Sequence, residues 1–411
     1  MRSRKLVNKG KKSLLTYLLI GGIVVAILAG CFYLYHQIKA INDMTHVSIE
    51  DTSQQKNKQT AEGTDEIPPL KTVYNSENPA SQKIDQYLQH AKFNGTIAVF
   101  ENGQLMMNKG YGYQDFESGK KNDPNTLYLI GSAQKFLTGM MVKKLELENK
   151  VNVNDPVSKY ISGFEFHQKL TIEDLLRHRS GFYKYQGSDK ILDLNGAIKE
   201  IHQRGIDPKF YHKHFYNDAN YLVLAKVIEN VTHQSYVKNY YHFIGNPLEL
   251  THSAFFNDTR YDEHFAKGYG IDKKTNAPYY RPPQYLDQYY GAGNIYMSAH
   301  DMGVLVRSLQ TNQMFPQDVT HPYLHELMTK RYPEKYRYGF YVYNDKNRIN
   351  GIFFGHIFTT YFNDQYIVVL ATNDDQPNPN NNEAKIKHIY YNILNQRAII
   401  NQPGVTVGPE N

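Results

Sequence analysis

Apolar residues along this chain form one long block near the N-terminus and then a series of shorter periodic segments. Residues 13–35 are almost entirely apolar and carry no charge, which suits a helix that crosses a bilayer. Residues 36–79 are polar, so we expect a flexible linker there. Periodic apolar positions occupy residues 80–398, and residues 399–411 form a short tail. The pattern predicts one folded body behind an anchor and a spacer.

Within the body the period of the apolar pattern changes twice. Alternating runs at 96–100 and 105–113 predict the two strands of a hairpin. Helical periodicity then dominates residues 150–250, approximately. Strand patterns return at 336–343, 351–362 and 366–372. A final helix is expected at 384–395. This order predicts an α/β fold of the α+β type: an antiparallel sheet flanked by helices, built from both ends of the body, with an all-helical region inserted.

The positive charge of the chain is concentrated at its N-terminus. Six of the 46 Lys and Arg residues stand in residues 1–12, and the remainder equal the 40 acidic residues in number. Positive charge before an apolar span predicts that residues 1–12 are a cytoplasmic tail and that the body lies outside the cell membrane. The neutral body has no basic repeat or motif typical of nucleic-acid binding, so no nucleic-acid partner is expected.

Cys31 is the only cysteine, so no disulfide framework or thiolate metal site is expected. The stretch Leu28-Ala29-Gly30-Cys31 resembles a lipobox, the signal for a lipid-anchored protein. Residues 32–35 continue the apolar run instead of turning polar, which favours an uncleaved membrane anchor over a lipoprotein. In either case the body is tethered on the extracellular face of the membrane.

The first candidate for chemistry is Ser132 with Lys135, at the start of a predicted long helix. Residues three apart lie on one face of a helix, so Lys135 can reach the Ser132 hydroxyl. Free backbone N–H groups at a helix start, including that of Ser132, can stabilise an oxyanion. The alternative is that Ser132 only caps the helix and Lys135 is a solvated lysine. A lone pair at this spacing does not decide between them.

Two further motifs fit the same chemistry. Tyr216-Asn217-Asp218 stands at the start of a second strong helix pattern. Asn350-Gly351-Ile352 lies on a late strand, with glycine where a backbone would have to approach a ligand closely. Serine acyl-transfer enzymes with S-x-x-K motifs carry a second motif on the helical region and a third on a strand. A lysine or histidine is usual in the third motif and is missing here.

Taken together, these motifs resemble the penicillin-binding protein and class C β-lactamase superfamily over residues 80–398, and more narrowly the FmtA-type teichoic acid D-alanine esterases of staphylococci. The resemblance implies a β-lactamase/transpeptidase-like fold. It also implies a serine esterase that removes D-alanine from teichoic acids through a Ser132 acyl-enzyme, with a part in cell-wall charge and β-lactam resistance. Supporting stretches are 110–113, 129–135, 154–160, 175–181, 291–294 and 350–355.

The resemblance implies roles for the motif residues. Ser132 is the nucleophile, with Lys135, Tyr216 and Asp218 as its catalytic partners. The backbone N–H groups of Ser132 and Ile352 form the oxyanion hole, with Gly351 and Asn350 beside them in the substrate-binding strand. Arg348 is the nearby cation that could replace the missing one.

Asp218 stands where most members of the superfamily carry asparagine, and three interpretations are open. It could keep Lys135 charged and leave the Tyr216 phenol to move protons. It could bind the D-alanine ammonium, or it could only cap its helix. Other enzymatic and non-enzymatic interpretations are a penicillin-binding DD-peptidase or β-lactamase-like protein of low activity, and a non-catalytic wall-binding protein.

No cofactor and no metal are expected. His321 and His325 have helical metal-ligand spacing, but no third ligand is identifiable and Pro322 follows the first histidine. His178, in the 175–181 stretch, is structural in relatives. The expected partners are teichoic acid, the membrane and, by acylation, β-lactams; the oligomeric state is left open by the sequence.

Overall fold

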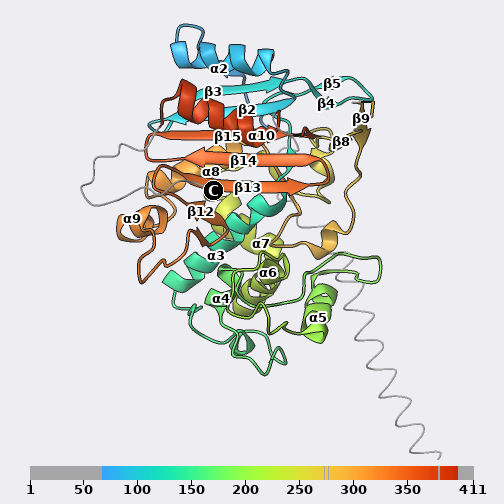
Figure 1. Cartoon of the computed structure of the whole chain (residues 1–411), viewed down its shortest axis with the longest axis vertical. Coiled ribbons are helices and arrows are strands. Elements are labelled where there is room, and N and C mark those ends of the chain that lie inside the picture. The colour runs from blue at the N-terminus through green and yellow to red at the C-terminus, as the bar shows by residue number, and fades with distance from the viewer. Residues whose placement is uncertain (1–66, 273, 276, 378–379, 397–411) are drawn as a thin grey trace, which may run out of the picture. The chain divides into compact units, whose positions relative to one another are not determined.

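The computed structural model describes residues 67–396 except 273, 276, 378 and 379. Its main sheet has eight strands in the order β1-β3-β2-β15-β14-β13-β12-β11, and every neighbouring pair is antiparallel (Figure 1). The predicted sheet built from both ends of the body is therefore confirmed. The strands are β1 (Val73–Tyr74), β2 (Gly95–Glu101), β3 (Gln104–Tyr111), β11 (Tyr336–Arg337), β12 (Phe340–Val342), β13 (Asn347–Phe353), β14 (His356–Phe362) and β15 (Tyr366–Thr372).

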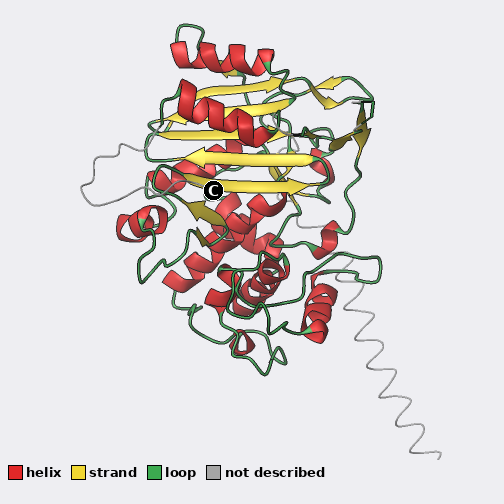
Figure 2. Cartoon of the chain, viewed as in Figure 1, coloured by secondary structure: helices red, strands yellow, loops and turns green. Residues whose placement is uncertain are grey.

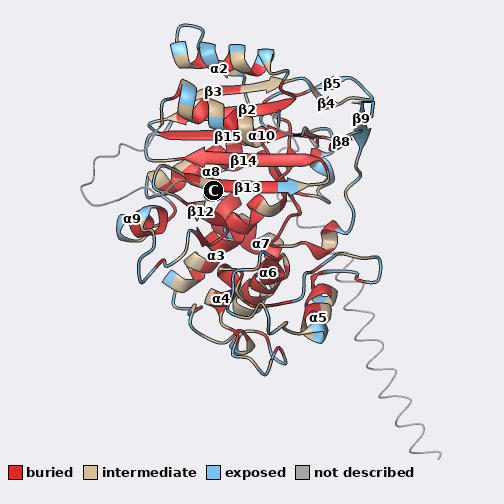
Figure 3. Ribbon diagram, viewed as in Figure 1, coloured by how far each residue is buried: buried red, intermediate tan, exposed pale blue. Residues whose placement is uncertain are grey.

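Both faces of the central strands are covered, which explains their nearly continuous apolar sequences (Figure 3). Along β2, Ile97 and Val99 pack on the face covered by α2 (Pro79–His90) and α10 (Asn382–Lys387). Ala98 and Phe100 belong to the larger core on the other face, which includes α3 (Gln134–Leu147) and α8 (Ala299–Gln310). This alternation is the two-residue period of a strand.

The helical region lies between the two groups of strands in the sequence, as predicted (Figure 2). It contains α4, α5, α6 and α7, and α7 continues as a π-turn over Tyr241–Gly245. Helix α4 begins at a capping box, in which Thr171 and Asp174 satisfy each other's backbone N–H groups. The helices are α4 (Ile172–Leu176), α5 (Leu194–Arg204), α6 (Ala219–Thr232) and α7 (Tyr236–Tyr240).

The other strands pair with one another outside the main sheet. Strands β6, β10 and β7 form one small sheet, strands β16, β8 and β9 a second, and β4 pairs with β5. Their bounds, with those of α9, are β4 (Tyr113–Asp115), β5 (Lys120–Lys121), β6 (Tyr128–Leu129), β7 (Ser253–Phe255), β8 (Tyr269–Ile271), β9 (Pro278–Tyr280), β10 (Ile295–Met297), β16 (Asp374–Asp375) and α9 (Gln317–His325).

Two predicted strands are in fact hairpins. The segment 351–362 turns at Phe354 and Gly355, whose φ angles of 46° and 86° suit a two-residue hairpin turn between β13 and β14. The segment 336–343 is divided into β11 and β12 by Tyr338 and Gly339, with φ angles of 46° and 89°. Because one chain reversal was missed in each segment, the prediction of single strands there was wrong.

The predicted linker extends too far, because the folded body begins before residue 80. Strand β1 pairs with β3, and the backbone N–H of Leu70 donates to Asn125 Oδ1 at 2.6 Å. Within 67–396, gaps aside, no helix is long and apolar enough to cross a membrane. The predicted cytoplasmic tail, anchor with Cys31, and C-terminal tail lie outside the described residues.

Candidate active site

Ser132 and Lys135 meet at the turn that leads into α3. Strand β6 ends at Leu129, a 3₁₀ turn covers Gly131–Ala133, and α3 begins at Gln134. Lys135 is fully buried, and its Nζ lies 2.9 Å from Ser132 Oγ. The interpretation of Lys135 as a solvated surface lysine is therefore wrong.

The Lys135 ammonium has three hydrogen-bond acceptors around it. Besides Ser132 Oγ, they are the carbonyl of Ala292 at 3.2 Å and Asp218 Oδ1 at 2.7 Å. An ammonium carries three donors, so each acceptor takes one. Burial by itself lowers the pKa of Lys135, but the charge and hydrogen bond of Asp218, with Tyr216 acting in the same direction, raise that pKa above its ordinary value. The geometry is that of a charged lysine.

Asp218 reaches Lys135 because Asn217, its neighbour, takes over the capping of α6. Asn217 Oδ1 accepts from the backbone N–H of Ala219 at 3.1 Å, whereas the Asp218 side chain caps nothing. The Asn217 amide also donates to the carbonyl of Phe182 at 2.8 Å, which fixes the turn. The interpretation of Asp218 as a helix cap alone is wrong. Its side chain is 30% exposed, so it also faces the solvent side of the site.

Tyr216 stands over Lys135 and is held by a buried histidine. The Tyr216 ring lies 5.2 Å from Lys135 Nζ and 4.2 Å from the His178 ring, centroid to centroid for the latter. His178 Nδ1 accepts from the backbone N–H of Asn217 at 3.2 Å, so Nε2 carries the proton and donates to Tyr336 Oη at 3.0 Å. Burial, with the positive charge of Lys135, holds the pKa of His178 well below its usual value. His178 is neutral and positions Tyr216.

Strand β13 presents a free edge to the serine turn. Strand β12 pairs only with Asn347 and Arg348 of β13, so the residues after them meet the Gly131–Ala133 turn instead. A Cβ at Gly351 would lie 1.8 Å from the Ile130 carbonyl oxygen, so only glycine fits there. The Ile352 nitrogen approaches Gly131, while the Ile352 side chain is 55% exposed. The structure thus brings Gly351 and Ile352 to Ser132; the role of the Ile352 N–H as an oxyanion donor stays a prediction.

Asn350 is the predicted site residue whose side chain points elsewhere. Its Oδ1 accepts from Thr359 Oγ1 at 2.9 Å, on the face of the sheet that α10 covers. Arg348, two residues earlier and on the same face, pairs with Glu383 of α10 at 3.0 Å. The prediction of Asn350 as a substrate-binding side chain was wrong, and Arg348 does not replace the missing cation of the third motif.

Known proteins share the sequence pattern and the fold of this chain. A family model described as Beta-lactamase matches residues 80–390. The chain belongs to the beta-lactamase family. It is 54% identical over 345 residues to the teichoic acid D-alanine hydrolase of Staphylococcus aureus (strain MRSA252), covering 84% of this chain and 85% of the relative. The crystal structure of FmtA from Staphylococcus aureus is 53% identical, with a TM-score of 0.79, and the match covers 84% of this chain and 97% of that one.

The fold extends to more distant proteins. A penicillin-binding protein homologue from Pyrococcus abyssi, described as octameric, has a TM-score of 0.64 at 20% identity, with 79% of this chain and 78% of that chain covered. At this identity the likeness concerns the fold alone. The predicted β-lactamase/transpeptidase-like fold and the resemblance to FmtA-type proteins are both confirmed.

The sequence reasoning missed the support beneath Tyr216. Tyr336 had no motif to mark it, because it begins the two-residue strand β11, and 35 tyrosines offer no way to choose one. His178 did carry a weak signal in its position after an apolar helix pattern. Among the residues described, no group of three or more His, Cys, Asp or Glu side chains is arranged to hold a metal ion.

Proposed function

We propose that this chain is a serine esterase that removes D-alanine from teichoic acids through an acyl-enzyme on Ser132. The observation that carries the proposal is the Lys135 ammonium held between Ser132 Oγ and Asp218 Oδ1, at 2.9 Å and 2.7 Å. A relative that is 54% identical and covered over 85% of its length is named for this activity.

In the first step Ser132 Oγ attacks the carbonyl carbon of the ester. As its proton passes to Lys135, a Lys135 proton passes to Asp218, so Lys135 remains charged before and after the attack. This relay uses the pair at its observed contacts and does not need a neutral lysine. The negative carbonyl oxygen would be stabilised by the backbone N–H groups of Ser132 and Ile352, and the loss of one such donor typically costs about 10²–10³-fold in kcat.

In the second step the polyol leaves as an alcohol. Tyr216 is 38% exposed above Lys135 and is the group placed to donate the proton. The proton held on Asp218 returns through Lys135 to Tyr216, which restores the starting charges. Water then cleaves the acyl-enzyme by the same path in reverse, releasing D-alanine and free Ser132.

The charges at the site suit an aminoacyl ester. D-Alanine joined to a polyol has a free ammonium and no free carboxylate. Asp218 is the carboxylate that the ammonium would meet, since its side chain is 30% exposed beside Ser132. Arg348 faces Glu383 and offers no cation for a substrate carboxylate. This charge pattern favours an ester over a peptide that ends in a carboxylate.

The test is D-alanine release from D-alanylated teichoic acid by the full-length protein. The wild type is expected to release D-alanine, and Ser132→Ala to release none above background. Ser118→Ala, which changes an exposed serine in a turn, is the matched control and should behave as the wild type. Absence of release combined with turnover of β-lactams or D-Ala-D-Ala peptides would replace the proposal with the DD-peptidase or β-lactamase alternative. No covalent labelling of Ser132 by any of these substrates would favour a wall-binding protein.

We propose further that residues 13–35 anchor the protein in the cell membrane with the body on the extracellular face. Support comes from the uncharged apolar run and the basic residues before it. Protease treatment of intact cells should remove the body and leave the N-terminal segment in the membrane. β-Lactam acylation of Ser132 is proposed from the family fold, and a labelled penicillin that fails to mark the wild type would exclude it.

A further inference from the structure

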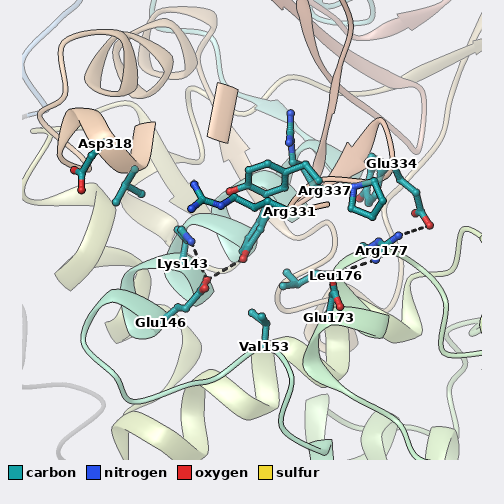
Figure 4. Close-up of a pocket in the computed structure, with 15 residues that line it drawn as sticks. Lys143, Glu146, Val153, Glu173, Leu176, Arg177, Asp318, Arg331, Glu334 and Arg337 are labelled. Carbon is teal, nitrogen blue, oxygen red and sulfur yellow. Dashed lines mark hydrogen bonds and ion pairs between the residues drawn. The ribbon is translucent and has the colours of Figure 1, made fainter. Parts of the chain in front are cut away.

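A cavity of about 320 Å³ lies behind the catalytic residues, between α3, α4, α9 and the segment that leads into β11 (Figure 4). Its floor contains the buried residues Tyr332, Tyr336 and Arg337, and its rim contains the exposed Asp318 and Arg331. The cavity therefore has a buried base and an opening to solvent. None of the proposed catalytic side chains lines it.

Most charged side chains around the cavity neutralise one another. Lys143 pairs with Glu146 at 3.1 Å, and Arg177 pairs with Glu173 at 3.1 Å and Glu334 at 2.5 Å. Figure 4 shows these contacts as dashed lines along two sides of the cavity. The charged lining residues outside these ion pairs are two arginines and one carboxylate at the rim.

Those arginines are Arg331 and Arg337, and neither has an ion pair among the described residues. Arg337 is only 3% exposed, yet its Nε and Nη1 have no hydrogen-bond partner in the part of the chain that the structure describes. Its Nη2 donates to the Glu326 carbonyl, and its guanidinium lies 3.9 Å from the Tyr332 ring centroid. Burial lowers the pKa of Arg337 to about 10, so it stays charged at neutral pH. A buried charge without a counterion is costly, which makes this arginine a place for an anion.

The chemistry of the lining defines the anion. A guanidinium presents parallel N–H groups that match two oxygens of a phosphate, and a second guanidinium stands at the rim. The rim carboxylate of Asp318 and the paired carboxylates of Glu146 and Glu173 would repel a ligand with several negative charges, but they accept hydrogen bonds from hydroxyl groups. The volume exceeds the needs of a lone phosphate.

From these contacts we infer that the cavity binds one phosphodiester group of a polyol phosphate, with its oxygens on Arg337 and Arg331 and its flanking hydroxyls on the carboxylates. The inference rests on the proposed function only for the source of the ligand, since a teichoic acid supplies polyol phosphate along its backbone. The cavity would hold the polymer while a D-alanyl ester elsewhere on it reaches Ser132.

The cavity is distinct from the active site but adjoins it. Lys143 on its wall lies about 12 Å along α3 from Lys135, at the rise of 1.5 Å per residue of an α-helix. Tyr336 is shared: its ring lines the cavity, and its hydroxyl accepts from His178, which packs against Tyr216. A polymer bound in the cavity would therefore lie within a short distance of the catalytic tyrosine.

The test measures binding without catalysis. Full-length Ser132→Ala protein is titrated calorimetrically with bis(glycerol) phosphate that carries no D-alanine, with inorganic phosphate and with acetate. We expect the diester to bind, and binding to weaken at least tenfold in Arg331→Gln, whose side chain is exposed and whose loss should not disturb folding. Lys335→Gln removes an exposed cation outside the cavity and is the matched control. Equal binding by the Arg331 variant, or preference for acetate or free phosphate over the diester, would overturn the inference.

A second measurement separates this inference from the proposed function. With active protein, Arg331→Gln is expected to raise KM for D-alanylated teichoic acid and to leave kcat for a small D-alanyl ester unchanged. If the wild type hydrolyses neither substrate but Ser132→Ala still binds the diester through Arg331, the proposed function fails and the binding site stands. An unchanged KM for the polymer would show that the cavity does not hold the substrate.

Discussion

Replacing Asp218 with asparagine should lower the pKa of Lys135. This change can be measured through the pH dependence of the free energy of unfolding. Asp218→Asn keeps the size of the side chain and removes the negative charge 2.7 Å from Lys135 Nζ. Lys135 is fully buried, so the ammonium would then lack a counterion. In the wild type, the carboxylate more than offsets the effect of burial on the Lys135 pKa.

The size of the effect follows from the contact distance. Two unit charges at this separation attract by about 6 kcal/mol at an effective dielectric constant near 20 and by about 1.5 kcal/mol in water. Because Asp218 is 30% exposed, the value should lie between these limits. About 1.4 kcal/mol corresponds to one pKa unit. Burial, the largest influence on this lysine, would then act without the charge that offsets it, so the Lys135 pKa in the variant should fall below its ordinary value.

The two proteins should differ in how unfolding depends on pH. In the wild type the folded pKa of Lys135 lies above the unfolded value of about 10.4. Its stabilising contribution is then complete below pH 10.4 and is lost only as the pH rises through the folded pKa. In Asp218→Asn the folded pKa lies below the unfolded one, so stability rises with pH between them by up to about 1.4 kcal/mol per unit.

The assay is urea unfolding of both proteins from pH 7 to pH 10, followed by the near-ultraviolet circular dichroism of the tyrosines. The stability difference between wild type and variant should shrink as the pH rises. Asp155→Asn, which breaks the surface pair of Asp155 with Lys159, is the control and should show no such trend. D-Alanyl ester hydrolysis should fall by about 10²-fold or more in Asp218→Asn. A stability difference that is constant with pH, or unchanged hydrolysis, would refute the reasoning.

Two further substitutions test the two faces of β13. Gly351→Ala would place a methyl group 1.8 Å from the Ile130 carbonyl oxygen and so displace the strand from the serine turn. The kcat/KM for a D-alanyl ester should therefore fall by about 10²-fold, and a fully active variant would mean that the strand can move without cost. Arg348→Gln removes the ion pair with Glu383 on the opposite face of the strand. It should lower the free energy of unfolding in urea by about 1 kcal/mol and leave kcat unchanged. A large loss of kcat would contradict the orientation of Arg348 away from the active site.

The sheet could be predicted from the sequence because its strands are long and apolar, but its hairpin turns could not all be found. The turn between β13 and β14 uses Phe354 and Gly355 without the Asn-Gly or Asp-Gly pair that marks such turns. Phe354 adopts a positive φ that phenylalanine disfavours in isolation. Only the pairing of the two strands makes this turn favourable, and pairing is not visible in a local pattern.

The site was predictable where its residues are close in sequence. The spacing of Ser132 and Lys135 dictates their contact once α3 forms, whereas the contact of Asp218 with Lys135 depends on how α6 packs against α3. The orientation of Asn350 was an avoidable error. If Gly351 faces the serine turn, the two-residue period of a strand directs the side chain of Asn350 to the opposite face. Arg337 had no motif, because its role depends on a cavity formed by distant segments.

The pairing of β2 with β15 determines when the body can complete its folding. Strand β2 is among the first elements of the body and β15 among the last, yet they are neighbours at the centre of the sheet. During synthesis from the N-terminus, the apolar β2–β3 hairpin therefore remains without its partner strand β15 until nearly all of the body has been made. Contacts between residues so far apart in the sequence slow folding. Chains that stop before β15 would expose Ile97 and Val99 along an unpaired edge, and they are expected to aggregate and not to form a smaller active enzyme.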